Sequence, residues 1–294
     1  LSLGFVEAMT ANEKAEIDTL GGRTKQTVEP LTNYFIGRVQ KDFNEGKTIL
    51  GGIVTSTNRD IDARLGSFMH KSAYSGGIDF TQYFKDKNWM FNISSAFSQV
   101  NGSKEALQLT QRSSARYFQR PDNNYTEYDP ERTSLAGSGG KILLQKLNGH
   151  LFLMGCVLWR SPGFEIHDLG YIQEADEVLS IFAAGYSEWE PKGIYRNYNV
   201  NADIWTAHNF GGQLAGTGFE WNGSMGFKNY WNAWTGGNLS TSQLSAGTLR
   251  GGPMMKIPGN LRLYGGFSSD FRKKLNFSTF ANISRGLEKN SGSI

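Results

Sequence analysis

The chain has 294 residues, of which 38% are hydrophobic and 13% aromatic, with 36 glycines and a net charge of +3. This hydrophobic share is low for a water-soluble domain of this length, whereas a barrel wall with one face in water needs only one apolar face. Acidic and basic residues are interspersed, which excludes the clustered basic surface of a nucleic-acid-binding protein. The lone cysteine, Cys156, excludes an internal disulfide framework and a zinc site built on paired cysteines, and we interpret it as a buried hydrophobe.

The first half of the chain predicts hairpins of β-strands and one helix. Strands are expected at residues 1–10, 33–43, 48–59, 76–84 and 88–100. Asn44-Glu45-Gly46 and Lys85-Asp86-Lys87 are expected to form two of the turns between them. The segment 103–114 is the helix candidate, with Ser103 as its N-cap, and it would lie in a loop.

The second half continues the same rhythm. Residues 139–147 and 150–160 are predicted strands around Asn148-Gly149, the strongest two-residue hairpin signal. A strand at 198–210 follows, then strands at 212–221 and 224–234 around a second hairpin signal, Asn222-Gly223. The last two strands are expected at 261–271 and 275–283. The run 150–160 is apolar on both faces, so we expect a loop or plug to cover its polar-side face.

Each predicted strand has one apolar and one polar face. In one of them Leu261 and Leu263 alternate with Arg262 and Tyr264. No apolar run reaches the roughly 18–20 residues of a membrane helix, so any membrane crossing would be by strands. The pattern therefore predicts an all-β, antiparallel fold of about a dozen strands in one unit over 1–294, fitting a transmembrane barrel wall but also a soluble sandwich.

Two polar loops hold the candidate ligand residues. In the loop 112–138, Arg120, Asp122, Asp129 and Glu131 stand among tyrosines, which suits a calcium or sugar site. The alternative is a polar loop held by local ion pairs, and the spacing is not that of an EF-hand.

The second loop, 161–178, contains Glu165, His167 and Asp168. Carboxylates beside a histidine suit acid–base or metal chemistry, but a structured turn between strands explains them equally well. The glycine clusters match no phosphate-binding motif, and the four histidines are scattered along the chain. The residues therefore predict no catalytic group, no cofactor and no metal site.

Several quoted segments together resemble a known family. These are "GRVQKDFNEGKTILGGIVTSTNRD", "AYSGGIDF", "FQRPDNNYTEYDPERTSLAG", "SPGFEIHDLGYIQEAD" and "LRGGP". They are similar to large outer-membrane β-barrel proteins of unknown function in Gram-negative bacteria, which usually follow an N-terminal carbohydrate-binding-module-family-9-like domain. The resemblance implies that this chain is a fragment of the barrel, that it lies in the bacterial outer membrane, and that further strands complete a barrel of more than twenty.

The resemblance also implies a function without a catalytic residue. We expect a non-enzymatic component of a surface transport, export or assembly complex linked to glycan use, in contact with outer-membrane lipid. Its expected partners are other outer-membrane proteins or lipoproteins and glycans, not nucleic acid. The loops at 59–76 and 102–133 would plug the lumen. The alternative is a surface carbohydrate-binding or glycan-hydrolysing protein, and we assign any hydrolase activity to the preceding module.

Overall fold

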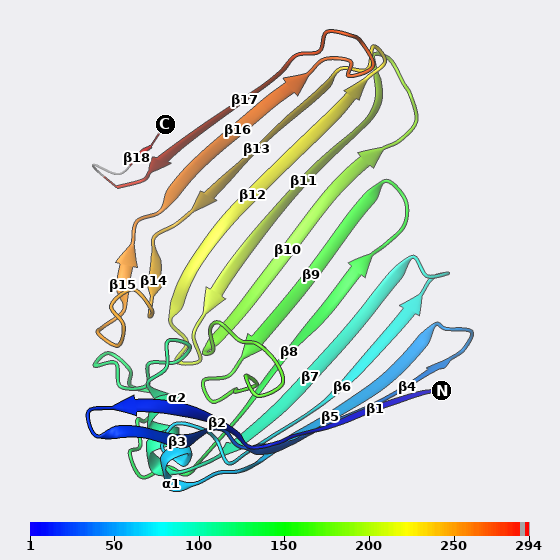
Figure 1. Cartoon of the computed structure of the whole chain (residues 1–294). Coiled ribbons are helices and arrows are strands. Elements are labelled where there is room, and N and C mark those ends of the chain that lie inside the picture. Colours follow the sequence, from blue (N-terminus) through cyan, green and yellow to red (C-terminus); the bar gives the residue numbers. More distant parts are fainter. Residues whose placement is uncertain (289–291, 294) are drawn as a thin grey trace.

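The computed structural model describes residues 1–288 and 292–293 as an all-β protein built on one large, curved antiparallel sheet (Figure 1). The sheet has 14 strands in the order β1-β4-β5-β6-β7-β8-β9-β10-β11-β12-β13-β16-β17-β18. Each strand therefore lies beside its neighbour along the chain, except where a two-stranded insert intervenes. The strands are β1 (Ser2–Thr10), β4 (Leu31–Phe43), β5 (Thr48–Asp60), β6 (Ser72–Phe84), β7 (Trp89–Asn101), β8 (Ser134–Lys146), β9 (Leu151–Arg160), β10 (Glu177–Glu188), β11 (Tyr195–His208), β12 (Leu214–Phe227), β13 (Asn232–Ser240), β16 (Asn260–Ser268), β17 (Ser278–Gly286) and β18 (Gly292–Ser293).

The other elements gather at one end of the strands, here called the loop end (Figure 1). They are two small hairpins and two short helices: β2 (Glu13–Thr19) with β3 (Gly22–Glu29), β14 (Gln243–Ser245) with β15 (Met255–Ile257), α1 (Ala63–Gly66) and α2 (Lys104–Gln111). The opposite end, here called the turn end, has much shorter connections, such as 44–47, 85–88 and 147–150. The long connections therefore lie at the loop end of the strands, and the short ones lie at the turn end.

The strand register divides the side chains between two faces. Thr55, Ser75 and Ser98 lie opposite one another on the face that the loops cover, here called the inner face. The other, outer face carries large apolar side chains that are more than half exposed. They include Phe5, Val54, Ile78, Phe97, Phe182, Val200 and Ile283.

Charged residues are nearly absent from the middle of the outer face. From β5 to β13, each charged residue on that face stands within two residues of a strand end, as do Asp60, Lys146 and Glu188. No second sheet covers the outer face in the part of the chain that the structure describes. The apolar face of this large sheet is therefore exposed, and the sandwich alternative is not the observed architecture.

Most of the predicted local elements are confirmed. Turns form at 44–47, 85–88 and 147–150, and α2 begins after Ser103, whose hydroxyl accepts a hydrogen bond from Ala106 N–H at 3.2 Å. The sequence did not predict α1, the two small hairpins or β10. The predicted loop 59–76 is shorter, because β5 extends to Asp60 and β6 begins at Ser72.

The hairpin predicted at Asn222-Gly223 is wrong. β12 runs through both residues, and they pair with Gly236 and Thr235 of β13, while the turn lies after Phe227. Asn222 is instead a polar inner-face residue that accepts a hydrogen bond from Asn201 at 3.1 Å. The predicted strand at 275–283 also begins later, at Ser278, because Leu275 and Phe277 belong to the preceding turn.

The sheet is open within the described residues, because the two edge strands, β1 and β18, do not pair with each other. β1 is exposed along its whole length, and its free edge is apolar, with Phe5 82% exposed. None of the described helices is long and apolar enough to span a membrane. Cys156 is half-buried on the inner face of β9 beside Leu143 and Ile181, so the predicted cover over this strand is incomplete.

Candidate functional site

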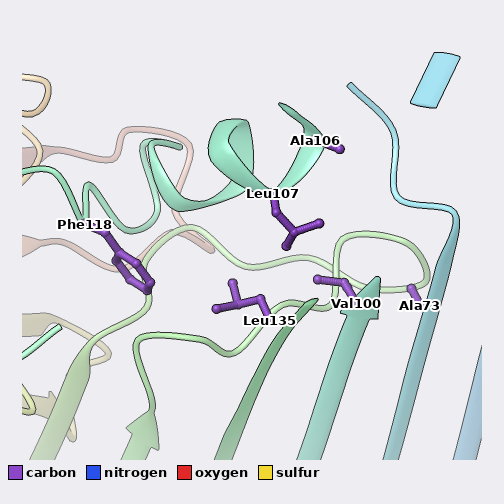
Figure 2. Close-up of a cluster of buried hydrophobic side chains, with 6 residues drawn as sticks. All are labelled: Ala73, Val100, Ala106, Leu107, Phe118 and Leu135. Carbon is purple, nitrogen blue, oxygen red and sulfur yellow. The ribbon is translucent and has the colours of Figure 1, made fainter. Parts of the chain in front are cut away.

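Three connections from the loop end fold over the inner face and form the loop layer, defined here as residues 61–71, 102–133 and 161–176. Their anchor is a cluster of buried apolar side chains between α2 and strands β6 to β8 (Figure 2). Leu107 of α2 and Val100 of β7 are completely buried within it. The cluster consists of Ala73, Val100, Ala106, Leu107, Phe118 and Leu135. Burial of these side chains provides the hydrophobic stabilisation that holds the layer to the sheet.

The local sequence explains why α2 lies there. Ala106, Leu107 and Thr110 share one buried helix face, as expected from the spacing of positions three and four apart. The Ser103 hydroxyl caps the first turn and also donates to the Gly66 carbonyl at 2.7 Å. This one residue therefore starts α2 and ties it to the end of α1.

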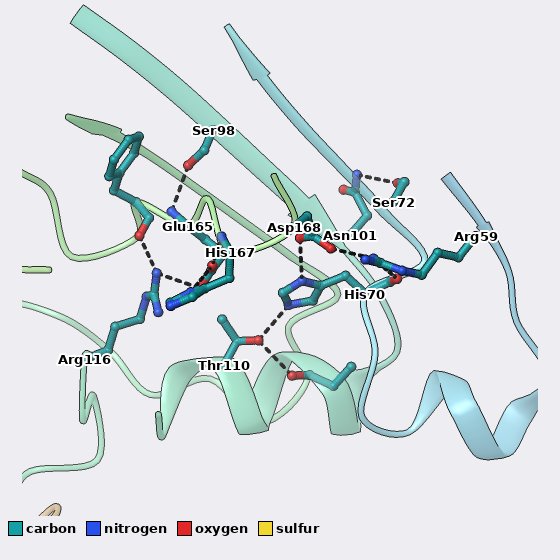
Figure 3. A network of polar contacts seen from close by, with 12 residues as sticks. Arg59, His70, Ser72, Ser98, Asn101, Thr110, Arg116, Glu165, His167 and Asp168 are labelled. Atoms are coloured by element: carbon teal, nitrogen blue, oxygen red, sulfur yellow. Dashed lines mark hydrogen bonds and ion pairs between the residues drawn. The ribbon is translucent and has the colours of Figure 1, made fainter. Parts of the chain in front are cut away.

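Glu165 lies in a buried ion pair, not in an open cleft (Figure 3). Its carboxylate is 2.9 Å from the guanidinium of Arg116, and the two side chains are 4% and 0% exposed. The backbone N–H of Glu165 donates to the Ser98 hydroxyl of β7, and His167 Nδ1 is 2.6 Å from the Glu165 carboxylate. Burial raises the pKa of Glu165, but Arg116 and the hydrogen bonds from His167 outweigh it, so the net pKa is lowered.

Asp168 holds the same loop to a different part of the sheet (Figure 3). Its carboxylate oxygens lie 2.5 Å from Arg59 Nη1 of β5 and 3.3 Å from His70 Nδ1. His70 in turn contacts the Thr110 hydroxyl of α2 at 2.7 Å through Nε2. Burial raises the pKa of Asp168, but His70 and Arg59 together lower it below its ordinary value. This chain of contacts joins β5, the first loop, α2 and the third loop.

Arg120 and Asp122 link the layer to later loops. Arg120 lies 3.8 Å from Asp176, which also accepts a hydrogen bond from the Phe210 N–H at 2.9 Å and another from the Tyr125 hydroxyl. Asp122 accepts from the Met254 N–H at 2.8 Å, across 132 residues of sequence. Burial raises the pKa of Asp176 despite the hydrogen bonds that oppose this shift.

Asp129 and Glu131 lie apart from the other predicted residues, at the rim of the layer. The backbone of Asp129 exchanges two hydrogen bonds with the Gln111 side chain, at 2.8 and 2.9 Å. Glu131 pairs with Lys104, and both side chains are at least half exposed. These two carboxylates therefore do not converge with Glu165 or Asp168.

Of the predicted residues, only Glu165, His167 and Asp168 lie close together, in the third loop. The other four make separate contacts. The described residues contain no group of three or more histidine, cysteine or acidic side chains that could hold a metal ion. Glu165 and Asp168 each face a separate arginine, so their carboxylates serve as structural anions. Sequence reasoning missed the cationic partners Arg59 and Arg116. The sequence indicated only that the loop contains several acidic residues. Any of them that is buried needs a positively charged or hydrogen-bonding partner.

A broad hollow of about 590 Å³ lies on the inner face beside the loop layer. Phe164 of the third loop forms one wall, and Leu158 of β9 forms another. Arg38 and Asp79 border it and hold each other through two hydrogen bonds of 2.7 and 3.0 Å. The inner face therefore offers a water-accessible, mixed-charge surface next to a fixed cover of loops.

Comparison with known proteins identifies a family for this chain but does not indicate an activity. A family model described as Domain of unknown function (DUF5916) matches residues 1–293, almost the whole chain. No curated protein matches the chain. The choice among functions therefore rests on the geometry above.

Proposed function

The chain belongs to the family described as Domain of unknown function (DUF5916), and we propose that it forms part of the wall of a β-barrel in the outer membrane of a Gram-negative bacterium. In this proposal it is a non-enzymatic component of a surface transport, export or assembly complex. Its partners are other outer-membrane proteins or lipoproteins, and the link to glycan use rests on the resemblance alone. The loop layer would narrow the lumen.

The apolar outer face carries the proposal. Large side chains such as Ile78, Phe97 and Phe182 are 56–65% exposed on it, and from β5 to β13 its few charges stand within two residues of strand ends. Water-soluble proteins rarely expose an apolar surface that spans so many strands. Lipid chains would cover such a face, while the polar inner face would meet water.

Aromatic side chains at the turn end support the same reading. Phe84 stacks on Trp89, and Trp231 stacks on Phe267, with ring centroids 6.3 and 5.9 Å apart. His150 lies between Tyr186 and Trp189 in a third group. Aromatic girdles of this kind mark the membrane–water interface of transmembrane barrels.

The open edges require a further part of the wall. Lipid cannot satisfy the unpaired N–H and C=O groups of β1, so a barrel in a membrane must close. We propose that further strands of the whole protein close it, giving more than twenty strands. A wall supplied by a partner protein is the alternative.

Detergent extraction and electrophoresis of the native full-length protein test the proposal. We expect membrane residence and a gel mobility that changes on boiling, as closed barrels show. Val54→Lys and Ile204→Lys, on the outer face, should each cost about 2–4 kcal/mol of stability in the membrane. Asn222→Lys, on the inner face of β12, is the matched control and should fold normally. Solubility without detergent and no mobility change would overturn the proposal.

A further inference from the structure

A second hollow lies on the inner face where β10, β11 and β12 meet the β14 strand. Its volume is about 560 Å³, within the usual range of small-molecule sites. Leu179 and Ile181 of β10 form an apolar side, and Gln243 and Leu244 of β14 line another side. Trp205 of β11 lies within it. The hollow is therefore a partly open groove on the inner face, lined by three strands and by the β14 segment.

The indole of Trp205 rests on the backbone of β12. A Cβ atom at Gly218 would lie 2.6 Å from Trp205 Cε2 and 2.7 Å from Nε1, and one at Gly216 would lie 3.5 Å from Cζ3. The contact at Gly218 is too short for any side chain, so glycine there leaves room for the ring, whereas the distance from Gly216 to the ring is an ordinary van der Waals contact. The ring thus lies against β12, and Trp205 also lines the groove. Trp205 forms a flat aromatic platform that is fixed before any ligand arrives.

Two carboxylates beside this platform, those of Asp203 and Glu220, form no ion pair among the described residues. Asp203 and Glu220 are directly opposite each other in the β11–β12 pair, where like charges are destabilising. Glu220 accepts a hydrogen bond from the neutral Asn238 amide at 2.6 Å, and Asp203 has no ion pair among the described residues. Glu177 is paired with Arg160, and no lysine, arginine or histidine is among the described residues that line the groove.

We propose that this groove binds an organic cation, specifically a guanidinium group such as the arginine side chain of a peptide. A planar guanidinium stacks on an indole face, and its N–H groups suit two adjacent carboxylates. Bound between Trp205 and the Asp203–Glu220 pair, it relieves the repulsion between these carboxylates. The carboxylates alone would describe a solvated acidic face, and the aromatic platform beside them in the same groove indicates a ligand. The inference needs only a water-accessible inner face and does not depend on lipid at the outer face.

Calorimetric titration of the full-length protein in detergent tests this inference, with Nα-acetyl-arginine amide as the probe. The citrulline analogue has nearly the same shape without the charge. We expect saturable binding of the arginine probe and at least tenfold weaker binding of the citrulline analogue. Trp205→Leu, Asp203→Asn and Glu220→Gln should each weaken binding of the arginine probe at least tenfold.

Asp42→Asn is the matched control, because Asp42 is an exposed inner-face carboxylate of β4, far along the sheet from the groove. The Asp42→Asn variant should bind the arginine probe with the same affinity as the unmodified protein. Equal binding of the two probes, no binding of either, or an equal loss in Asp42→Asn and Asp203→Asn would overturn the inference. Gel mobility before and after boiling identifies variants that fail to fold, and it tests the barrel separately.

Discussion

Glu165 and Asp168 stand three residues apart, yet each is paired with an arginine from a different part of the chain. Arg116 comes from the second loop and Arg59 from β5. Removing one partner of such a buried pair leaves an uncompensated charge, which is far more costly than losing an exposed pair such as Lys104–Glu131. These two residues therefore fix the position of the third loop over the inner face.

The same pairs predict how the loop layer responds to acid. The pKa values of Glu165 and Asp168 are lowered in the folded chain, so their stabilisation is fully present above the unfolded values of about 4. It is lost as the pH falls through the lower, folded values. We expect the hydrogen-exchange protection factors of residues 161–176 to fall below about pH 4, while those at the centres of the strands stay high.

Two other acids of the third loop act in the opposite direction. Burial raises the pKa values of Glu174 and Asp176, so their contribution to stability is greatest in acid and is lost as the pH rises through the folded values. Glu165→Gln removes an acid whose pKa is lowered in the folded chain, so it should flatten the acid response of exchange in the loop. Glu131→Gln, at the exposed rim, is the control and should leave that response unchanged. An unchanged response in Glu165→Gln would show that this pair does not control the loop.

The third loop packs so closely against β8 that only glycine fits at position 137. A Cβ atom at Gly137 would overlap the backbone of Gly163 and Phe164, and the loop is joined to β8 there by two hydrogen bonds of 2.8 Å between Ser138 and Ser161. The atoms nearest to this Cβ position belong to the backbone of the loop. A methyl group there could therefore not be accommodated by the movement of a side chain.

We therefore expect Gly137→Ala to displace the loop and to cost about 1–3 kcal/mol of stability, the usual range for overpacking. Gly155→Ala on β9 is the matched control, since nothing lies within 4 Å of its Cβ position, and its effect should stay within about 0.5 kcal/mol. Denaturant unfolding in detergent and limited proteolysis of residues 161–176 measure both variants. Equal behaviour of the two variants would contradict the observed contact.

The elements that sequence predicted best are those with local signals. Alternating polarity and short turns such as Asn148-Gly149 located the hairpins, and Ser103 located the start of α2. Asn222-Gly223 misled because the same dipeptide also suits an inner strand, where Asn222 bonds to a neighbouring asparagine. β10 was hidden because its first residue, Glu177, continues an acidic loop sequence.

The site was less predictable than the fold for a physical reason. Arg59 lies 109 residues before Asp168, and Arg116 lies 49 before Glu165, so nothing in the local sequence announces either pair. A single sequence shows that an acid needs a partner when it is buried, but not which arginine provides it. It also could not show that Gly218 of β12 makes room for Trp205.

At the scale of the whole molecule, the asymmetry between the two ends predicts how the proposed barrel would be oriented in a membrane. Long loops form one end of the sheet and short turns the other, and outer-membrane barrels place their long loops outside the cell. The loop layer would then face the exterior, with the aromatic groups of the turn end at the periplasmic interface.

Single cysteines at the two ends test this orientation in a Cys156→Ala background of the full-length protein. Asn124 is exposed in the second loop, and Glu190 is exposed in the turn between β10 and β11. We expect a membrane-impermeant maleimide to label Asn124→Cys on intact cells and to label Glu190→Cys only after the outer membrane is permeabilised. The reverse pattern would invert the orientation. Labelling of both sites on intact cells by a maleimide conjugate too large to pass a barrel lumen would mean that this sheet does not separate two compartments.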